Sequence, residues 1–277
     1  MQLHQSSWME IDAYLKTSKG IVVPIGSTEQ HGPNGLLGTD ALCPEVIAKR
    51  AGDEAGFLVG PTFNVGQAQH HLGFAGTISL RPSTMIAAIH DWTASLNRHG
   101  FEKIYWFNGH GGNVATITAA FSEIYADVSL KRTGANAAPV RCTLRNWWEL
   151  SGVGELCREA DPVGEGSHAT ASEVSVTYAA FPEAIKRVEM SPKIAPDAPT
   201  DAVVSGEKQY DATAPPRPAS TKSKVNLTCP KTISNVGPNM MSTNMLNPMC
   251  RIDQCKKTDV SSRYHCPSIA MKTGRIP

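Results

Sequence analysis

The sequence predicts an α/β fold of three layers, α/β/α, in which helices cover both faces of a mostly parallel sheet. Three observations lead to this prediction. Short apolar runs rich in β-branched residues, without polar alternation, are typical of strands buried on both faces. Amphipathic segments of about 12–15 residues separate these runs, as in βαβ units. Glycine-rich polar loops follow two of the runs. In such sheets ligands bind at the edge formed by the carboxyl ends of the strands, where these loops begin.

The first part of the chain predicts a helix, a strand, a second helix and a second strand. We expect a short helix over residues 7–19 and a buried strand over 21–25. Asp40 is expected to cap the following helix through its side-chain oxygen, with Pro44 in the first turn. The run at 57–59 predicts the second strand.

The rest of the predicted domain continues the alternation. In order, we expect a loop over 64–80, a helix over 82–99, a strand over 103–107, a helix over 114–125, a strand over 139–144 and a helix over 167–181. The carboxyl ends of parallel strands share one edge of the sheet. We therefore expect the loop after the first strand and the turn after the third to meet across one crevice.

Composition and charge exclude several classes of protein. The 277 residues are 41% apolar and 18% charged, with a formal net charge of +1, which gives no argument for binding nucleic acid. No apolar run approaches the roughly 18 residues of a membrane span, and the first twenty residues lack a signal-peptide pattern. Seven cysteines, an odd number, do not indicate a disulfide framework. We expect a cytoplasmic protein without membrane or nucleic-acid partners.

The sequence changes character near residue 200. Residues 201–277 contain eleven Lys and Arg and five Asp and Glu, a net charge of +6, against −5 for residues 1–200. The later segment is rich in Ser, Thr, Pro, Asn, Lys and Met and has no sustained apolar period, which predicts poor order. We therefore divide the chain into a domain at 1–200 and an atypical tail at 201–277, and interpret the tail as the product of a reading-frame change.

Metal-binding residue types gather in the loop after the first predicted strand. Glu29, His31 and Asp40 fall within twelve residues, and His110 lies between glycines after the third strand. Oxygen and imidazole donors without thiolate suit Zn, Mn or Fe. We expect a divalent-metal site, and His168 is a candidate for proton transfer to a leaving nitrogen.

Each of these features has a simpler interpretation when taken alone. An isolated Glu-x-His pair is usually a solvated loop, and the turn around His110 could cradle a phosphate, although it lacks the Lys and Ser/Thr of a P-loop. We interpret three further histidines as polar or capping residues: His70, His90 and His99. The metal interpretation is favoured because its members occur in the expected order at strand ends.

Four segments together resemble the creatininase family of metal-dependent amidohydrolases. They are Pro24-Ile-Gly-Ser-Thr-Glu-Gln-His31, His71-Leu-Gly-Phe-Ala-Gly-Thr-Ile-Ser79, Phe107-Asn-Gly-His-Gly-Gly-Asn113 and Ser167-His-Ala-Thr-Ala-Ser-Glu173. The resemblance covers roughly residues 7–195. It implies a creatininase-like α/β/α fold, two divalent ions per chain (Zn with Zn, Mn or Fe), hydrolysis of a small amide and a homo-oligomer, often a hexamer.

The resemblance also implies roles for individual residues. The metal ligands it implies are Glu29, His31, Asp40, His110 and Glu173, with Asp40 as the bridge. Creatininase itself has a glutamate ligand two positions after the histidine of its Asn-Gly-His motif, where this chain has Gly112, so creatinine is in doubt as the substrate. We assign the missing carboxylate to Glu173.

Two further pairs complete the expected site. The catalytic residues implied are His168 and Glu173, and the substrate-binding residues are His71 and Ser79.

The function expected from these residues is hydrolysis of a cyclic or formyl amide C–N bond that is not a peptide bond. Within the same fold, the alternatives are a formylamino-pyrimidine deformylase and a peptidase-like enzyme. An alternative of another class is an inactive metal-binding remnant without the family's C-terminal segment. The substrate depends on pocket residues outside the metal ligands.

Overall fold

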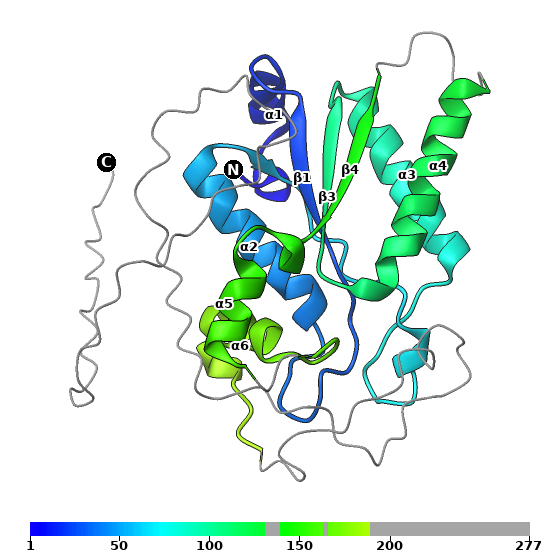
Figure 1. Ribbon diagram of the computed structural model, residues 1–277. Coiled ribbons are helices and arrows are strands. Elements are labelled where there is room, and N and C mark those ends of the chain that lie inside the picture. Colours follow the sequence, from blue (N-terminus) through cyan, green and yellow to red (C-terminus); the bar gives the residue numbers. More distant parts are fainter. Residues whose placement is uncertain (131–138, 163–165, 189–277) are drawn as a thin grey trace, which may run out of the picture.

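The computed structural model describes residues 1–130, 139–162 and 166–188, so the tail at 201–277 lies outside the described residues. The sheet has four parallel strands in the order β2-β1-β3-β4, and they are β1 (Gly20–Ile25), β2 (Leu58–Val59), β3 (Lys103–Asn108) and β4 (Arg141–Asn146). Helices lie on both faces of this sheet (Figure 1). The predicted three-layer fold with a parallel sheet is confirmed.

One face of the sheet packs against α3 (Pro82–Arg98) and α4 (Val114–Ser129). Because strand side chains alternate, every second residue of β1 and β3 points to this face. The resulting core contains Ile21, Val23, Ile25, Ile104 and Trp106 from the strands and Met85, Ile89, Ile117 and Ile124 from the helices. The short helix α1 (Trp8–Leu15) adds Leu15 to the same core.

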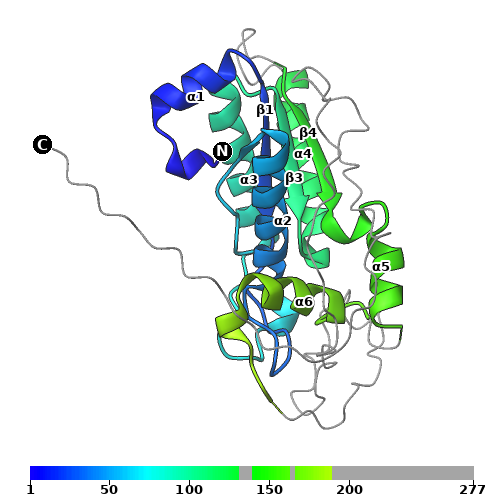
Figure 2. The same cartoon turned by 90° about the vertical axis from the view of Figure 1, so that its left-hand side faces the viewer.

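The opposite face packs against α2 (Thr39–Ala55) and α6 (Ala171–Ala180), and Figure 2 looks onto this side. The alternate strand residues Val22 and Phe107 meet Cys43 of α2 and Val176 of α6 there. The helix α5 (Val153–Ala160) also lies on this side (Figure 1). It was not predicted, because its eight residues are too short to show a clear helical period.

Two expectations about the start of α2 are wrong. The helix begins at Thr39 after Gly38, and no side chain caps it. Asp40 is the second helical residue, and its carboxylate faces two histidines instead of the free N–H groups of the first turn. Pro44 is the sixth residue, beyond the first turn, and its missing N–H leaves the carbonyl of Asp40 without its usual helical donor.

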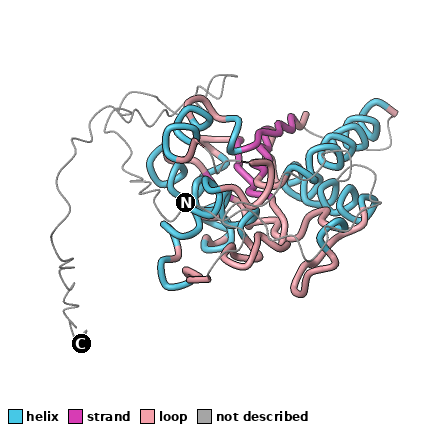
Figure 3. Tube along the Cα trace, turned by 60° about the horizontal axis from the view of Figure 1, so that its bottom comes forward, coloured by secondary structure: helices cyan, strands magenta, loops and turns pink. Residues whose placement is uncertain are grey.

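The loops that leave β1, β2 and β3 lie together at the carboxyl edge of the sheet, which Figure 3 brings forward. The pairings of β3 with β1 and with β4 are continuous up to this edge, with Ile25 beside Asn108 and Asn108 beside Asn146. In the described part of the chain, no helix combines the length and the apolar character needed to cross a membrane.

Candidate metal centre

The predicted metal ligands meet at the carboxyl edge of the sheet. Glu29 and His31 come from the loop after β1, Asp40 from the start of α2, His110 from the turn after β3, and Glu173 from the first turn of α6. Four of them are buried: Glu29 and His31 have no exposed surface, and Asp40 and His110 are 3% and 5% exposed. The convergence expected from strand order is therefore present.

Asp40 lies between the two histidines that are predicted ligands. Its Oδ1 is 2.9 Å from His31 Nε2, and its Oδ2 is 2.9 Å from His110 Nδ1. Burial opposes ionisation of this carboxyl, but the two imidazoles hold the pKa of Asp40 well below its usual range. Asp40 thus has one oxygen facing each half of the cluster, as a bridging ligand requires.

His31 has the hydrogen bonding of a metal-binding imidazole. Its Nδ1 donates to the backbone carbonyl of Glu29 at 3.0 Å, so Nε2 is directed at Asp40 and, at 3.7 Å, at Glu173 Oε1. A backbone carbonyl on one ring nitrogen fixes the orientation of the other. Burial favours the neutral ring, but the nearby carboxylates, chiefly Asp40, raise the pKa of His31 to about 10.

Glu29 is a fully buried carboxyl beside His110. Its Oε2 accepts a hydrogen bond from Ser27 Oγ at 2.9 Å and lies 3.3 Å from His110 Nε2. Burial, followed by the charge of Asp40, raises the pKa of Glu29 to about 8. The carboxylates in turn overcome the burial of His110 and raise its pKa to about 9.

Two carboxylate oxygens in the cluster fit a cation. Glu29 Oε1 and Asp40 Oδ2 are buried and accept no hydrogen bond of good geometry. A buried carboxylate oxygen without a donor is costly unless a charge or a metal compensates it. Two groups of side chains each bring three possible metal-binding atoms within 4.8 Å of one another. One group is His31, Asp40 and Glu173, and the other is Glu29, His31 and His168. The donor set fits Zn, Mn or Fe.

The segment before α6 holds His168 and Glu173 in place. Thr170 caps the helix, its N–H donates to Glu173 Oε1 at 2.6 Å, and Glu173 N–H donates back to Thr170 Oγ1. Ala169 has φ of +50°, a left-handed conformation that costs a non-glycine residue roughly 1–2 kcal/mol. The predicted helix at 167–181 therefore begins only at Ala171, and His168 lies in the preceding loop.

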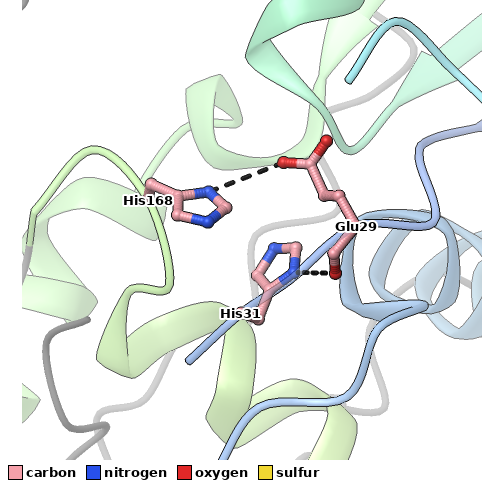
Figure 4. A group of neighbouring side chains, drawn as sticks. All are labelled: Glu29, His31 and His168. Atoms are coloured by element: carbon pink, nitrogen blue, oxygen red, sulfur yellow. Dashed lines mark hydrogen bonds and ion pairs between the residues drawn. The ribbon is translucent and has the colours of Figure 1, made fainter. Parts of the chain in front are cut away.

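Two groups of Gln30 lie close to His168 Nε2. The backbone carbonyl, which only accepts, is 2.8 Å away and the side-chain Nε2 is 3.1 Å away, so we assign the proton to His168 Nε2 on the shorter contact, with the carbonyl. Nδ1 then has a lone pair and lies 3.6 Å from Glu29 Oε1 (Figure 4). Burial and the charge of His31 lower the pKa of His168 to about 3, which keeps this lone pair unprotonated at neutral pH.

The two predicted substrate-binding residues differ in their surroundings. His71 is buried, with Nδ1 2.9 Å from Gln30 Nε2 and Nε2 3.4 Å from Glu29 Oε1, so it belongs to the cluster. The hydroxyl of Ser79 accepts from Ala68 N–H and donates to the Leu80 carbonyl, so its described hydrogen bonds hold the loop. A substrate contact of Ser79 stays a prediction.

The three histidines interpreted as polar or capping residues have different surroundings in the structure. His90 pairs with Asp127 at 2.7 Å, and His99 is the C-cap of α3. His70 instead belongs to the cluster. A ring nitrogen of His70, a carboxylate oxygen of Glu29 and a ring nitrogen of His110 all lie within 4.8 Å of one another. The sequence signal for His70 was its position beside His71, which the motif-based interpretation did not use.

The raised pKa values predict how metal affinity depends on pH. In the metal-free protein, Glu29, His110 and His31 keep their protons up to pH values of about 8, 9 and 10, and a bound ion must displace them. Zinc affinity should therefore rise from pH 6 to pH 9, by up to about tenfold per pH unit for each proton released. Chelator competition at several pH values, with calorimetry in two buffers, measures both quantities. Affinity that is constant over this range, without proton release, contradicts the prediction.

Comparison with known sequences places the chain among described proteins. A sequence model described as "Creatininase: Creatinine amidohydrolase" matches residues 4–223. Creatinine amidohydrolase of Pseudomonas putida is 25% identical over 190 residues, which are 65% of this chain and 71% of that protein. A mycofactocin precursor peptide peptidase of Mycolicibacterium smegmatis is 31% identical over 130 residues, 45% of this chain. The chain spans only 50% of that relative's length.

Solved structures agree with the sequence comparisons on the fold. A creatininase described with Mn superimposes with a TM-score of 0.62 at 23% identity, covering 72% of this chain and 80% of that one. A mutant creatininase of Zn–Zn type gives a TM-score of 0.61 at 24% identity, with the same coverage. At this level of identity the likeness establishes the shared fold.

Proposed function

This chain belongs to the creatininase family, and from that premise we propose that it is a metal-dependent amidohydrolase acting on a non-peptide amide C–N bond. The observation that carries the proposal is the position of Asp40, with one oxygen directed at His31 and the other at His110. Such an arrangement suits two ions sharing one carboxylate. Structural neighbours named with Mn and with a Zn–Zn pair support Zn or Mn for these positions.

The proposed ligands divide into two sets around Asp40. His31 and Glu173 would hold one ion together with Asp40, and Glu29 and His110 would hold the other, also together with Asp40. Two divalent ions close together activate water for attack on a carbonyl and stabilise the negative charge that forms. Ser27 orients Glu29, and the helix cap at Thr170 orients Glu173, so both carboxylates are held before an ion binds.

His168 is the proposed proton-transfer residue. Its Nδ1 lone pair faces the cluster, while its Nε2–H is held by the Gln30 carbonyl, so the ring can accept a proton on the side of the reacting atoms. The same nitrogen can then donate that proton to the leaving amide nitrogen. Glu173 is engaged in the helix cap and close to His31, which favours metal binding over proton transfer for this carboxylate.

Replacing His168 with glutamine is expected to lower kcat by about 10²–10⁴-fold while leaving both ions bound. The Gln side chain can still donate to the Gln30 carbonyl but has no basic nitrogen. The measurement is steady-state kinetics together with metal content, with exposed His99→Gln as the matched control. Loss of an ion in the His168 variant would show instead that His168 is a ligand, since it also lies within ligand distance of Glu29 and His31.

A peptide bond is the second candidate substrate. It is favoured by the Mycolicibacterium peptidase, which is more similar over its matched region, at 31% identity, than the Pseudomonas amidohydrolase, at 25%. Zinc- or manganese-loaded protein should be assayed with creatinine, small lactams, a formylamino-pyrimidine and short peptides. Hydrolysis of the small amides alone supports the proposal, and hydrolysis of peptides alone replaces it with a peptidase. A folded protein that binds divalent ions but hydrolyses none of these substrates supports the inactive metal-binding remnant, and a folded protein that binds no divalent ion contradicts the proposed enzyme.

Three expectations stay predictions: cytoplasmic location, the absence of nucleic-acid partners, and assembly into a homo-oligomer, for which the family resemblance implies a hexamer. Size-exclusion chromatography with light scattering measures the assembly directly.

A further inference from the structure

His70 is the histidine of the cluster that has no assigned role. We propose that His70 is a protein ligand of the divalent ion on the Glu29–His110 side of the pair. The inference rests on the proposed function, because it assumes that the cluster binds divalent ions. It adds an imidazole to a position that otherwise has Glu29, His110 and one oxygen of Asp40.

The placement of His70 relative to two proposed ligands carries this inference. One ligand atom from each of Glu29, His70 and His110 lie within 4.8 Å of one another, the same criterion that joins His31, Asp40 and Glu173 on the other side. The rings of His70 and His110 are nearly parallel, with centroids 6.1 Å apart and an angle of 10° between their planes. His70 is half-buried, so its ring keeps contact with both the cluster and solvent.

The backbone around His70 is tied to the turn that presents His110. Gln67 N–H donates to Asn113 Oδ1 at 3.0 Å, and the Gln67 carbonyl lies 3.0 Å from His110 Nε2. Ala68 N–H donates to Ser79 Oγ, and the 3₁₀ turn Gln69–His71 follows directly. His70 is therefore only three residues from a direct contact with His110, and its position is fixed by the same hydrogen bonds.

Gly112 lies directly against His110 and the loop that carries His70. A Cβ atom at Gly112 would lie 2.4 Å from His110 Nε2 and 2.8 Å from the Gln67 carbonyl oxygen. Both contacts are far shorter than van der Waals distance, so a side chain at this position would require the backbone around His110 to move. The turn after β3 thus contributes His110 alone, and His70 comes to the same group of side chains from the loop after β2.

The test measures binding of Zn²⁺ and Co²⁺ by the full chain, with His70→Ala and His70→Asp beside the wild type. After metal loading and gel filtration, wild type should retain close to two ions per chain. His70→Ala should retain one ion tightly and bind the second at least about 10-fold more weakly, and its bound Co²⁺ should show a changed visible spectrum. His70→Asp, which restores a ligand-capable side chain, should recover binding of the second ion. His99→Gln, a change at an exposed histidine, is the control.

The outcomes separate this inference from the proposed function. Wild type without bound ions overturns the proposed function itself. If wild type binds two ions and His70→Ala also binds two, with unchanged affinity and an unchanged Co²⁺ spectrum, only the role of His70 as a ligand is overturned. If that variant then differs from wild type only in a lower kcat, His70 is a substrate contact instead of a ligand. Melting temperatures of the metal-free proteins show whether His70→Ala misfolds. If it does, the metal content of His70→Asp compared with that of wild type decides whether His70 is a ligand.

Discussion

Changing Asp40 to asparagine is expected to remove both divalent ions from the protein and, with them, its hydrolytic activity. Asparagine keeps the shape of the side chain but loses the negative charge and replaces one oxygen with a donor NH₂ group. Each Asp40 oxygen faces a different histidine at 2.9 Å, so one substitution affects both halves of the cluster. The loss of metal affinity should exceed the roughly 10–100-fold that removal of an outer-shell partner causes.

Metal content by mass spectrometry and activity of the reloaded variant measure this effect. The matched control is Asp12→Asn, which changes an exposed aspartate of α1 that forms an ion pair with Lys16. A metal-free melting curve for each protein separates loss of ligands from loss of fold. Two tightly bound ions in the Asp40 variant would rule out the shared carboxylate, and with it the arrangement on which the proposed mechanism depends.

Changing Gly109 to alanine is expected to destabilise the fold by at least about 3 kcal/mol, the upper part of the range for overpacked cores. A Cβ atom at Gly109 would lie 1.9 Å from the backbone carbonyl oxygen of Asp40 and 2.6 Å from Cδ of Pro44. Both neighbours are rigid parts of α2, so the β3 turn and the helix would have to separate. At about 2–4 °C per kcal/mol for a domain of this size, the melting temperature should fall by about 6–12 °C or more.

The same turn provides the control for this prediction. A Cβ atom at Gly111 would meet nothing within 4 Å, so Gly111→Ala should change stability by less than about 1 kcal/mol and in the stabilising direction. Thermal melts of the two variants in chelator, where metal binding cannot contribute, compare them directly. Equal melting temperatures would show that α2 and the β3 turn do not pack as closely as the structure has them.

The order of apolar runs and amphipathic segments was enough to predict the layers, the parallel sheet and the convergence of Glu29, His31 and His110 at one edge. These follow from local chemistry, because runs such as residues 21–25 can be buried only inside a sheet covered on both faces. The helix α5 and the start of α6 were not predicted correctly. Short segments carry little periodic signal, and the left-handed Ala169 is imposed by its surroundings.

The roles of Asp40 and His70 show the limit of the local pattern. At the start of a helix, Asp40 has the chemistry of a cap, and only the approach of His31 and His110 from two other loops directs its carboxylate elsewhere. His70 has the chemistry of a solvated loop residue until hydrogen bonds of Gln67 to Asn113 and His110 bring its loop to the cluster.

The sequence by itself thus determined the fold class, the family resemblance and most of the metal-binding residue types in this protein. Only the tertiary structure decided which oxygen faces which imidazole, which nitrogen of His168 faces Glu29, and that His70 joins the cluster. The physical reason is that hydrophobic burial is encoded by nearby residues, whereas the direction of a buried carboxylate or imidazole depends on partners farther along the chain. The partner is 9 residues away for His31 with Asp40 and 138 residues away for His168 with Gln30.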